Sequence, residues 1–143
     1  MSHRQLTVED LMSTALVTAR PGDTVADVDL EMRLAAVRHI PIVDSQNRLV
    51  GIVSQRDILR ALPRSKTGSV PMRGVMSARV VTVQPSTPAA EAAEQMLQRK
   101  IGCLPVLGED GQLVGLVTES DFVRLARNLL VAPPARPRAR QAG

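Results

Sequence analysis

A chain of 143 residues that is 44% hydrophobic can build one compact unit or two small ones around an ordinary core. Its single aromatic residue, Phe122, argues against nucleic-acid modules that stack bases on aromatic side chains, and its single cysteine, Cys103, excludes an intrachain disulfide. Most of the net charge of +4 belongs to the final stretch "APPARPRARQAG", which we expect to be a solvated tail or, as the alternative, a polyanion-binding arm.

The beginning of the sequence has no apolar signal core, and no apolar run approaches the length of a membrane-spanning helix. We therefore expect a soluble, unexported, cytoplasmic protein with neither a membrane segment nor a nucleic-acid partner.

The sequence repeats itself when it is shifted by 64 residues without a gap. The identical pairs include Pro21 with Pro85, Met32 with Met96, Pro41 with Pro105, Gly51 with Gly115, and Asp57 with Asp121. Because two copies are too few for a solenoid, we expect two similar halves packed face to face around a pseudo-twofold axis.

In chain order, the first repeat predicts a strand over 15–19, a helix over 25–36 with Thr24 as its N-cap, a hairpin of "HIPIVD" and "RLVGIVS", and a helix over 55–62. The second repeat predicts a strand over 79–83, a helix capped by Thr87 with Pro88 in its first position, a hairpin of "CLPVL" and "QLVGLVT", and a helix over 119–130. Each unit is thus β-α-β-β-α, and the fold class is α/β (α+β).

These elements predict a first domain over 1–62, a linker over 63–74, a second domain over 75–130 and a disordered tail over 131–143. The linker is rich in Pro, Gly and Ser, and no acid occurs between Asp57 and Glu91 although five basic residues do. It is either a solvated connection or a positive rim beside an anion site.

Each hairpin ends in a hydroxyl residue that precedes an aspartate by three positions: Ser54 before Asp57, and Thr118 before Asp121. This spacing is typical of a capping box at a helix start. It also suits a nucleotide, because the helix start attracts phosphate and a carboxylate accepts hydrogen bonds from ribose hydroxyls. Gly51 and Gly115, in the middle of their strands, would permit close backbone approach. The two interpretations are compatible.

The stretches "IPIVDSQNRLVGIVSQRDIL" and "LPVLGEDGQLVGLVTESDFV", with "LMSTALVTARPGDTV" and "VMSARVVTVQPSTPA" upstream, resemble the CBS domain, the family named after cystathionine β-synthase. The resemblance covers residues of about 8–126. It implies a CBS pair, or Bateman module, with two clefts between its repeats that bind AMP, ADP, ATP or S-adenosylmethionine.

In the family, the hydroxyl of the motif contacts phosphate or ribose and the aspartate holds the ribose hydroxyls. The resemblance therefore implies the following nucleotide-binding residues: Thr18, Arg38, His39, Ser54, Arg56, Asp57, Thr82, Cys103, Thr118 and Asp121. His39 and Cys103 also have an ordinary explanation as packed side chains, as does Arg38 as a surface arginine.

The two repeats differ in charge around these positions. The first repeat has Arg38 and Arg56 where the second has Gly102 and Ser120, and Glu119 adds an acid to the second. In nucleotide-binding family members the position of Arg38 carries a basic residue that faces phosphate. We therefore predict that the first-repeat cleft prefers ligands with more phosphate.

We thus predict a stand-alone regulatory module that binds an adenine nucleotide as a regulatory ligand and signals by a change of shape or partner. It needs no other cofactor and no metal. The family resemblance also implies a homodimer, and the regulated protein is unidentified. The alternative is a structural dimerisation module with empty clefts. An enzyme is disfavoured, because the sequence has no nucleophile–base–acid set and no phosphate-binding Gly-rich loop.

Overall fold

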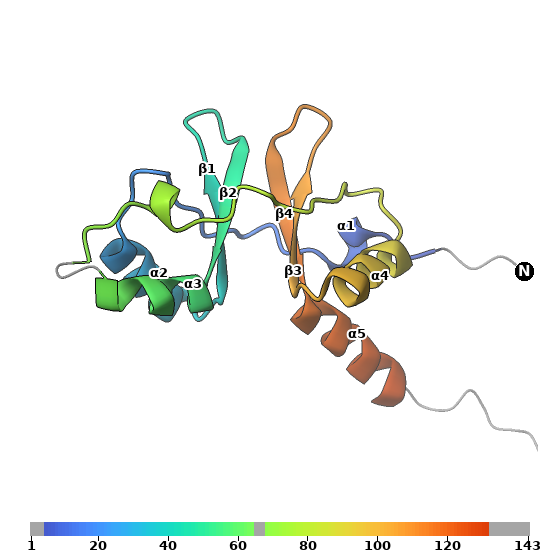
Figure 1. The fold of residues 1–143 in the computed structure, drawn as a ribbon. Helices are drawn as coiled ribbons and strands as arrows, with labels where there is room; N and C mark the ends of the chain where they lie inside the picture. Colours follow the sequence, from blue (N-terminus) through green and yellow to red (C-terminus); the bar gives the residue numbers. More distant parts are fainter. Residues whose placement is uncertain (1–4, 65–67, 132–143) are drawn as a thin grey trace, which may run out of the picture.

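The computed structural model of the protein describes residues 5–64 and 68–131, which form two similar halves (Figure 1). Each half is a β-hairpin flanked by two helices, so the predicted α/β class is confirmed. The first repeat consists of α2 (Val25–Ala35), β1 (His39–Val43), β2 (Leu49–Ser54) and α3 (Gln55–Ala61). The second consists of α4 (Ala89–Arg99), β3 (Cys103–Leu107), β4 (Leu113–Thr118) and α5 (Glu119–Val131).

The strands predicted at 15–19 and 79–83 are wrong as regular strands. Each segment makes one parallel bridge, from Ala19 to Ile42 and from Val83 to Val106. The Ala19 N–H donates to Pro41 at 3.1 Å and its carbonyl accepts from Val43 at 2.9 Å. The alternation of apolar residues is present, but the chain lies beside the hairpin for only one residue before a proline turns it away.

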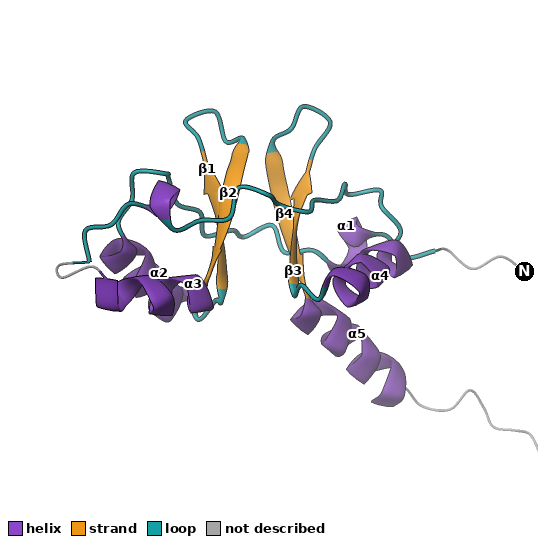
Figure 2. Ribbon diagram, viewed as in Figure 1, coloured by secondary structure: helices purple, strands orange, loops and turns teal. Residues whose placement is uncertain are grey.

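The two hairpins stand side by side in the middle of the molecule with the helices outside them (Figure 2). In each hairpin the antiparallel register pairs the first strand residue with the hydroxyl residue of the motif: His39 with Ser54, and Cys103 with Thr118. The hairpin tips also join, because the Leu113 N–H donates to the Asn47 carbonyl at 3.1 Å.

The predicted cap of α2 is confirmed, because the Asp27 N–H donates to Oγ1 of Thr24 at 3.3 Å. The predicted cap of α4 is wrong. The N-cap is Pro88, and the Thr87 hydroxyl instead accepts a 3.0 Å hydrogen bond from the Gln84 N–H in the preceding turn. Both residue types suit a helix start, and the turn competes for the hydroxyl.

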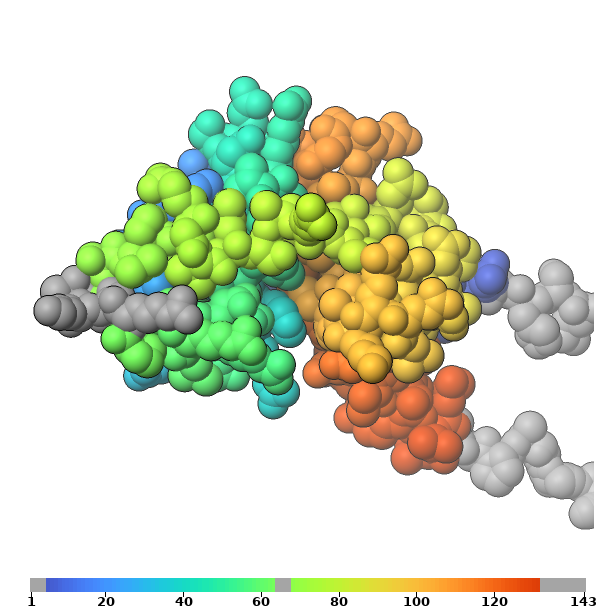
Figure 3. All heavy atoms as spheres, in the orientation of Figure 1, coloured from blue at the N-terminus to red at the C-terminus, as the bar shows by residue number. Residues whose placement is uncertain are grey.

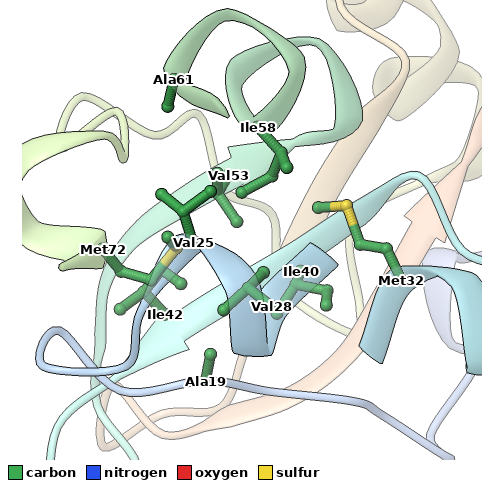
Figure 4. Close-up of a cluster of buried hydrophobic side chains, with 10 residues drawn as sticks. All are labelled: Ala19, Val25, Val28, Met32, Ile40, Ile42, Val53, Ile58, Ala61 and Met72. Carbon is green, nitrogen blue, oxygen red and sulfur yellow. The ribbon is translucent and has the colours of Figure 1, made fainter. Parts of the chain in front are cut away.

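The core of the first half is entirely aliphatic and sulfur-containing (Figure 4). Val25, Val28 and Met32 follow helical spacing and form the buried face of α2 against the hairpin residues Ile40 and Ile42. The second half has an equivalent but separate core around Ala92, Met96, Leu104, Val106 and Val117.

The segment that precedes each repeat packs into the core of the other repeat. Met72, in a short 3₁₀ helix (Met72–Gly74), is fully buried in the first core, although we expected its surroundings to be a solvated linker. Val8, in α1 (Val8–Leu11), is fully buried in the second core. Val8 and Met72 are 64 residues apart, so the exchange obeys the same repeat. The two halves are therefore interlocked.

Gly51 and Gly115 allow this exchange. A Cβ at Gly51 would lie 2.6 Å from the sulfur of Met76, and one at Gly115 would lie 2.6 Å from the sulfur of Met12. The close backbone approach expected at these glycines is confirmed, because the carbonyls of Ser77 and Ser13 would lie 2.9 and 3.2 Å from the two added Cβ atoms.

Helix α5 projects below the second half and buries none of its residues (Figure 3). In the described part of the chain, no helix is long and apolar enough to cross a membrane. The arginine-containing tail predicted to be disordered lies outside the described residues.

Candidate functional site

A cleft of about 620 Å³ lies between the two repeats. Its first wall comes from the first repeat and contains the end of β2 and the start of α3. Its second wall comes from the second repeat and from the segment that leads into it. The lining residues are Arg38, His39, Ile52, Ser54, Gln55, Arg56, Asp57, Leu59, Ser77, Arg79, Val80, Val81, Lys100, Ile101, Gly102, Cys103 and Glu119.

The motif Ser54–Asp57 forms a complete capping box on this wall. The Ser54 N–H donates to Oδ2 of Asp57 at 2.8 Å, and the Asp57 N–H donates to Oγ of Ser54 at 3.1 Å. Among residues 5–64 and 68–131, Oδ1 of Asp57 has no hydrogen-bond partner. The capping interpretation is therefore confirmed, and Asp57, which lines this cleft and a smaller neighbouring cavity, keeps one carboxylate oxygen without a partner among the described residues.

Four cationic side chains line the cleft. Arg38 and Arg56 belong to the first repeat, whereas Arg79 and Lys100 come from the second wall. All four are exposed, and within the described part of the chain none of them forms an ion pair. Only two acids, Asp57 and Glu119, oppose them. The cleft therefore carries an excess of positive charge.

The remaining lining side chains are largely aliphatic. Ile52 and Leu59 come from the first repeat, and Val80, Val81 and Ile101 come from the second wall. A ligand that combines a flat apolar group with hydroxyls and negative charge matches this combination of walls, carboxylate and cations.

His39 lies half-buried in the cleft, and burial lowers the pKa of its imidazole below the usual 6.5. The nearby carboxylates of Asp57 and Glu119 partly oppose this shift, while Arg38 adds to it. Desolvation disfavours the charged form more strongly than the carboxylates favour it. His39 is therefore neutral near pH 7.

Cys103 occupies the equivalent position of the second repeat and is buried. Burial raises the pKa of its thiol to about 12, and the charge of Asp121 adds to the effect. The thiol is therefore protonated at neutral pH and is not a nucleophile.

Of the ten predicted site residues, the cleft brings together six: Arg38, His39, Ser54, Arg56, Asp57 and Cys103. The other four do not line it. Thr82 lies in a separate groove with Gln84 and Thr87. Thr18 is exposed and does not line this cleft. Thr118 and Asp121 belong to the second motif.

The second motif has a different hydrogen-bond arrangement. Oδ2 of Asp121 accepts from the N–H of Thr118 at 2.8 Å and lies 3.4 Å from its Oγ1. Oδ1 accepts from the Arg124 guanidinium at 2.8 Å. Both carboxylate oxygens of Asp121 are thus engaged.

Sequence reasoning missed the second wall. Arg79 is one of the five basic residues between Asp57 and Glu91. The sequence pattern does not single out the other residues of this wall: Ser77, Val80, Lys100 and Ile101. The segment reaches the cleft because Ser77 bridges to Ile52, with hydrogen bonds of 2.9 and 3.0 Å between their backbones. The available signal was the repeat itself, which requires every cleft to have a wall from each half.

Among the described residues, no group of three or more His, Cys, Asp or Glu side chains could hold a metal ion.

The sequence matches the CBS domain twice, over residues 8–64 and 72–128. The chain is a pair of CBS domains. Both matched ranges begin at the exchanged residues Val8 and Met72, so each CBS domain in sequence starts with a segment that packs in the opposite half.

This CBS pair aligns with several solved structures over nearly their whole length. A putative acetoin utilization protein, AcuB, from Vibrio cholerae is 41% identical, with a TM-score of 0.82 over 89% of this chain and 94% of that one. The CBS domain pair of protein MJ0100, in complex with 5-methylthioadenosine and S-adenosyl-L-methionine, is 27% identical, with a TM-score of 0.81 over 88% and 99%. CBSX2 in complex with AMP is 31% identical, with a TM-score of 0.77 over 87% and 98%. Arabidopsis thaliana is the source of CBSX2.

Curated relatives place the same pair in two contexts. A CBS domain-containing protein of Dictyostelium discoideum is 32% identical, over 89% of this chain and 95% of its own length. The chain spans only 24% of a homoserine O-acetyltransferase of Methanohalobium evestigatum and 25% of an inosine-5'-monophosphate dehydrogenase of Bifidobacterium longum. The relatives that this chain matches over nearly their full length have no room for a catalytic domain beside their CBS pair.

Proposed function

We propose that this CBS pair binds an adenine nucleotide in the cleft between its repeats and acts as a regulatory sensor. The observation that supports the proposal most strongly is a single cleft lined by aliphatic walls, by four cations without an ion pair, and by an aspartate with one oxygen that lacks a partner among the described residues. A nucleoside phosphate presents the three matching groups.

Each part of the nucleotide has a candidate partner. Oδ1 of Asp57 accepts from the ribose hydroxyls, and the cations Arg38, Arg56, Arg79 and Lys100 surround the phosphates. The base lies between the aliphatic side chains of the two walls. Charge-assisted hydrogen bonds to carboxylate and phosphate are stronger than neutral ones, so these contacts carry most of the specificity.

The comparisons support the ligand class. The similar structures hold 5-methylthioadenosine with S-adenosyl-L-methionine in one case and AMP in another. All three ligands share the adenosine unit. The positive cleft of this chain favours the phosphorylated members of the class.

The role is binding rather than catalysis. The cleft thiol is protonated, and the Ser54 hydroxyl serves the capping box rather than a neighbouring base. Because the walls belong to different repeats, a bound nucleotide contacts both halves and favours the arrangement in which they bind it best. That shift is the signal passed to a regulated protein.

We also propose that two copies of the chain form a homodimer through their helices. Among residues 5–64 and 68–131, the large apolar side chains that are strongly exposed lie on helices and not on hairpins: Leu30 and Leu34 on α2, Leu59 on α3, which also lines the cleft, Leu97 on α4, and Val123, Leu129, Leu130 and Val131 on α5. The repeat relates α2 to α4 and α3 to α5. In a twofold dimer, each copy contributes the same surface to the interface. Packing these side chains against a second copy would remove their apolar area from water.

Calorimetric titration of the purified chain with adenosine, AMP, ADP, ATP and S-adenosylmethionine tests the nucleotide proposal. We expect binding of at least one phosphorylated nucleotide, and stabilisation by about 2.7 kcal/mol at a ligand concentration 100 times the dissociation constant. If no compound binds or stabilises the chain, the alternative of a dimerisation module without ligand is correct.

A further inference from the structure

The two motifs of this CBS pair share the sequence spacing D-x-x-R, yet the arginines behave differently. Arg124 donates a 2.8 Å hydrogen bond to Oδ1 of Asp121. Arg60, at the matching position of the first repeat, makes no ion pair with Asp57 in the described part of the chain. It lies instead with Asp57 at a smaller cavity that the exchanged residues Val70 and Val75 help to line.

We infer that the chain binds one nucleotide, in the first-repeat cleft only, because Arg124 and Thr118 occupy the carboxylate of Asp121 that a second ribose would need. The inference rests on the proposed function and adds a stoichiometry and a closed second motif to it. It also revises the role that the family resemblance implies for Thr118 and Asp121.

The first argument is hydrogen-bond capacity. A ribose presents two neighbouring hydroxyl donors to a carboxylate. Oδ2 of Asp121 already serves the backbone and hydroxyl of Thr118, and Oδ1 already serves Arg124. The Asp121 side chain is only 10% exposed, so a ribose would have to displace the guanidinium to reach it. At Asp57 the corresponding oxygen is without a partner among the described residues.

The second argument is charge, because the Arg124 side chain is 58% exposed and its ion pair alone is a weak barrier. Each cation of the first cleft has an uncharged residue 64 positions away. The pairs are Arg38 with Gly102, Arg56 with Ser120, Arg79 with Ala15, and Lys100 with Ala36. At these four matching positions the second motif therefore offers no cation to a phosphate.

Glu119 strengthens this asymmetry. Its side chain lies against Gly102, in the space that a Cβ there would need, and its N–H donates to the Gly102 carbonyl at 3.0 Å. The first repeat has the neutral Gln55 at the matching position. The second motif thus begins with a carboxylate of its own, whereas in the first cleft, which Glu119 also lines, four cations outnumber two acids.

The test is calorimetric stoichiometry with ATP on the full chain, using the matched variants Asp57→Ala and Asp121→Ala. We expect one ATP per wild-type chain, at least a tenfold loss of affinity in Asp57→Ala, and a change of less than threefold in Asp121→Ala. Asp121→Asn, which keeps the size and one acceptor, replaces Asp121→Ala if that variant fails to unfold cooperatively. Two ATP per wild-type chain, or a tenfold loss in the Asp121 variant, overturns the inference and leaves the proposed function standing. No binding at all overturns both.

A second titration, with adenosine, isolates the role of Arg124 because adenosine carries no phosphate. Arg124→Ala frees Oδ1 of Asp121, so we expect the stoichiometry to rise from one to two adenosines per chain. Arg60→Ala is the matched control and should leave it at one. An unchanged stoichiometry in Arg124→Ala overturns the assignment of Arg124 as the group that closes the second motif.

Discussion

Ser54 and Asp57 each donate a backbone N–H to the other's side chain, at 2.8 and 3.1 Å, and so fix the start of α3 at the wall of the cleft. The pair caps the helix and leaves Oδ1 of Asp57 without a partner among the described residues. The two roles can be separated experimentally, because a cap contributes to the free energy of unfolding and a ligand acceptor contributes to affinity.

Asp57→Ala should weaken AMP or ATP binding by ten- to hundredfold, because a charged acceptor for hydroxyls is worth about 1.5–3 kcal/mol. It should lower the free energy of unfolding by only about 1 kcal/mol through loss of the cap. Titration calorimetry and urea unfolding measure the two effects. Asp10→Ala is the control, since Asp10 completes a capping box with Thr7 in α1 away from the cleft. Unchanged affinity in Asp57→Ala would contradict the ribose assignment.

Arg38→Ala should weaken AMP and ATP binding while adenosine binding changes little, because we propose that its guanidinium, which lines the cleft, faces the phosphates. Removal of one charged contact predicts roughly a tenfold loss for ATP. The loss should shrink as salt is raised. Arg48→Ala removes the same charge from the hairpin turn, outside the cleft, and should leave all three affinities unchanged. Equal losses for adenosine, AMP and ATP would mean that Arg38 supports the fold instead.

The stability of the free protein should fall as the pH is lowered below about 6.5, the ordinary pKa of histidine, because of His39. Burial holds the folded pKa of His39 below 6.5, so the unfolded chain binds the proton first and unfolding becomes more favourable. Above pH 7 both states are neutral and the effect vanishes. Urea unfolding at several pH values should show this slope in the wild type and a smaller slope in His39→Gln. A stability that rises on acidification over this window would contradict the prediction.

Met72→Ala should lower the free energy of unfolding by about 2–5 kcal/mol, as expected for truncation of a fully buried core side chain. The neighbouring Arg73 is exposed, and Arg73→Ala should change stability by less than about 0.5 kcal/mol. Denaturant unfolding of both variants measures the difference. A loss near zero for Met72→Ala would show that the exchanged segment is not part of the first core.

The chain should sediment as a dimer at tens of micromolar, rather than as a monomer of 15.4 kDa. A charge on the proposed helical interface should dissociate it, because an unpaired charge in an apolar contact is costly. Leu97→Glu tests this, since Leu97 is 75% exposed on α4. Gln46→Glu adds the same charge at a hairpin turn and should leave the dimer intact. A monomeric wild type would refute the dimer proposal.

The sequence by itself determined the repeat, the helix–hairpin–helix order of each half and the capping motif at Ser54 and Asp57. These are local properties: apolar periodicity, turn residues and the spacing of a hydroxyl from a carboxylate are fixed within a few residues. The same local signals misplaced the cap of α4, because the turn before Pro88 and the helix compete for the hydroxyl of Thr87 and the pattern does not show which one binds it.

Only the tertiary structure decided how the repeats complete one another and which residues meet in the cleft. Met72 fills the first core and Val8 the second, and the same exchange brings Arg79 to the cleft wall opposite Asp57. It also decided that Arg124 forms an ion pair with Asp121, whereas in the described part of the chain Arg60 forms none with Asp57, although the two stretches read alike. The physical reason is that burial and ion pairing depend on neighbours far away in the sequence, and the 64-residue repeat leaves open which half each segment joins.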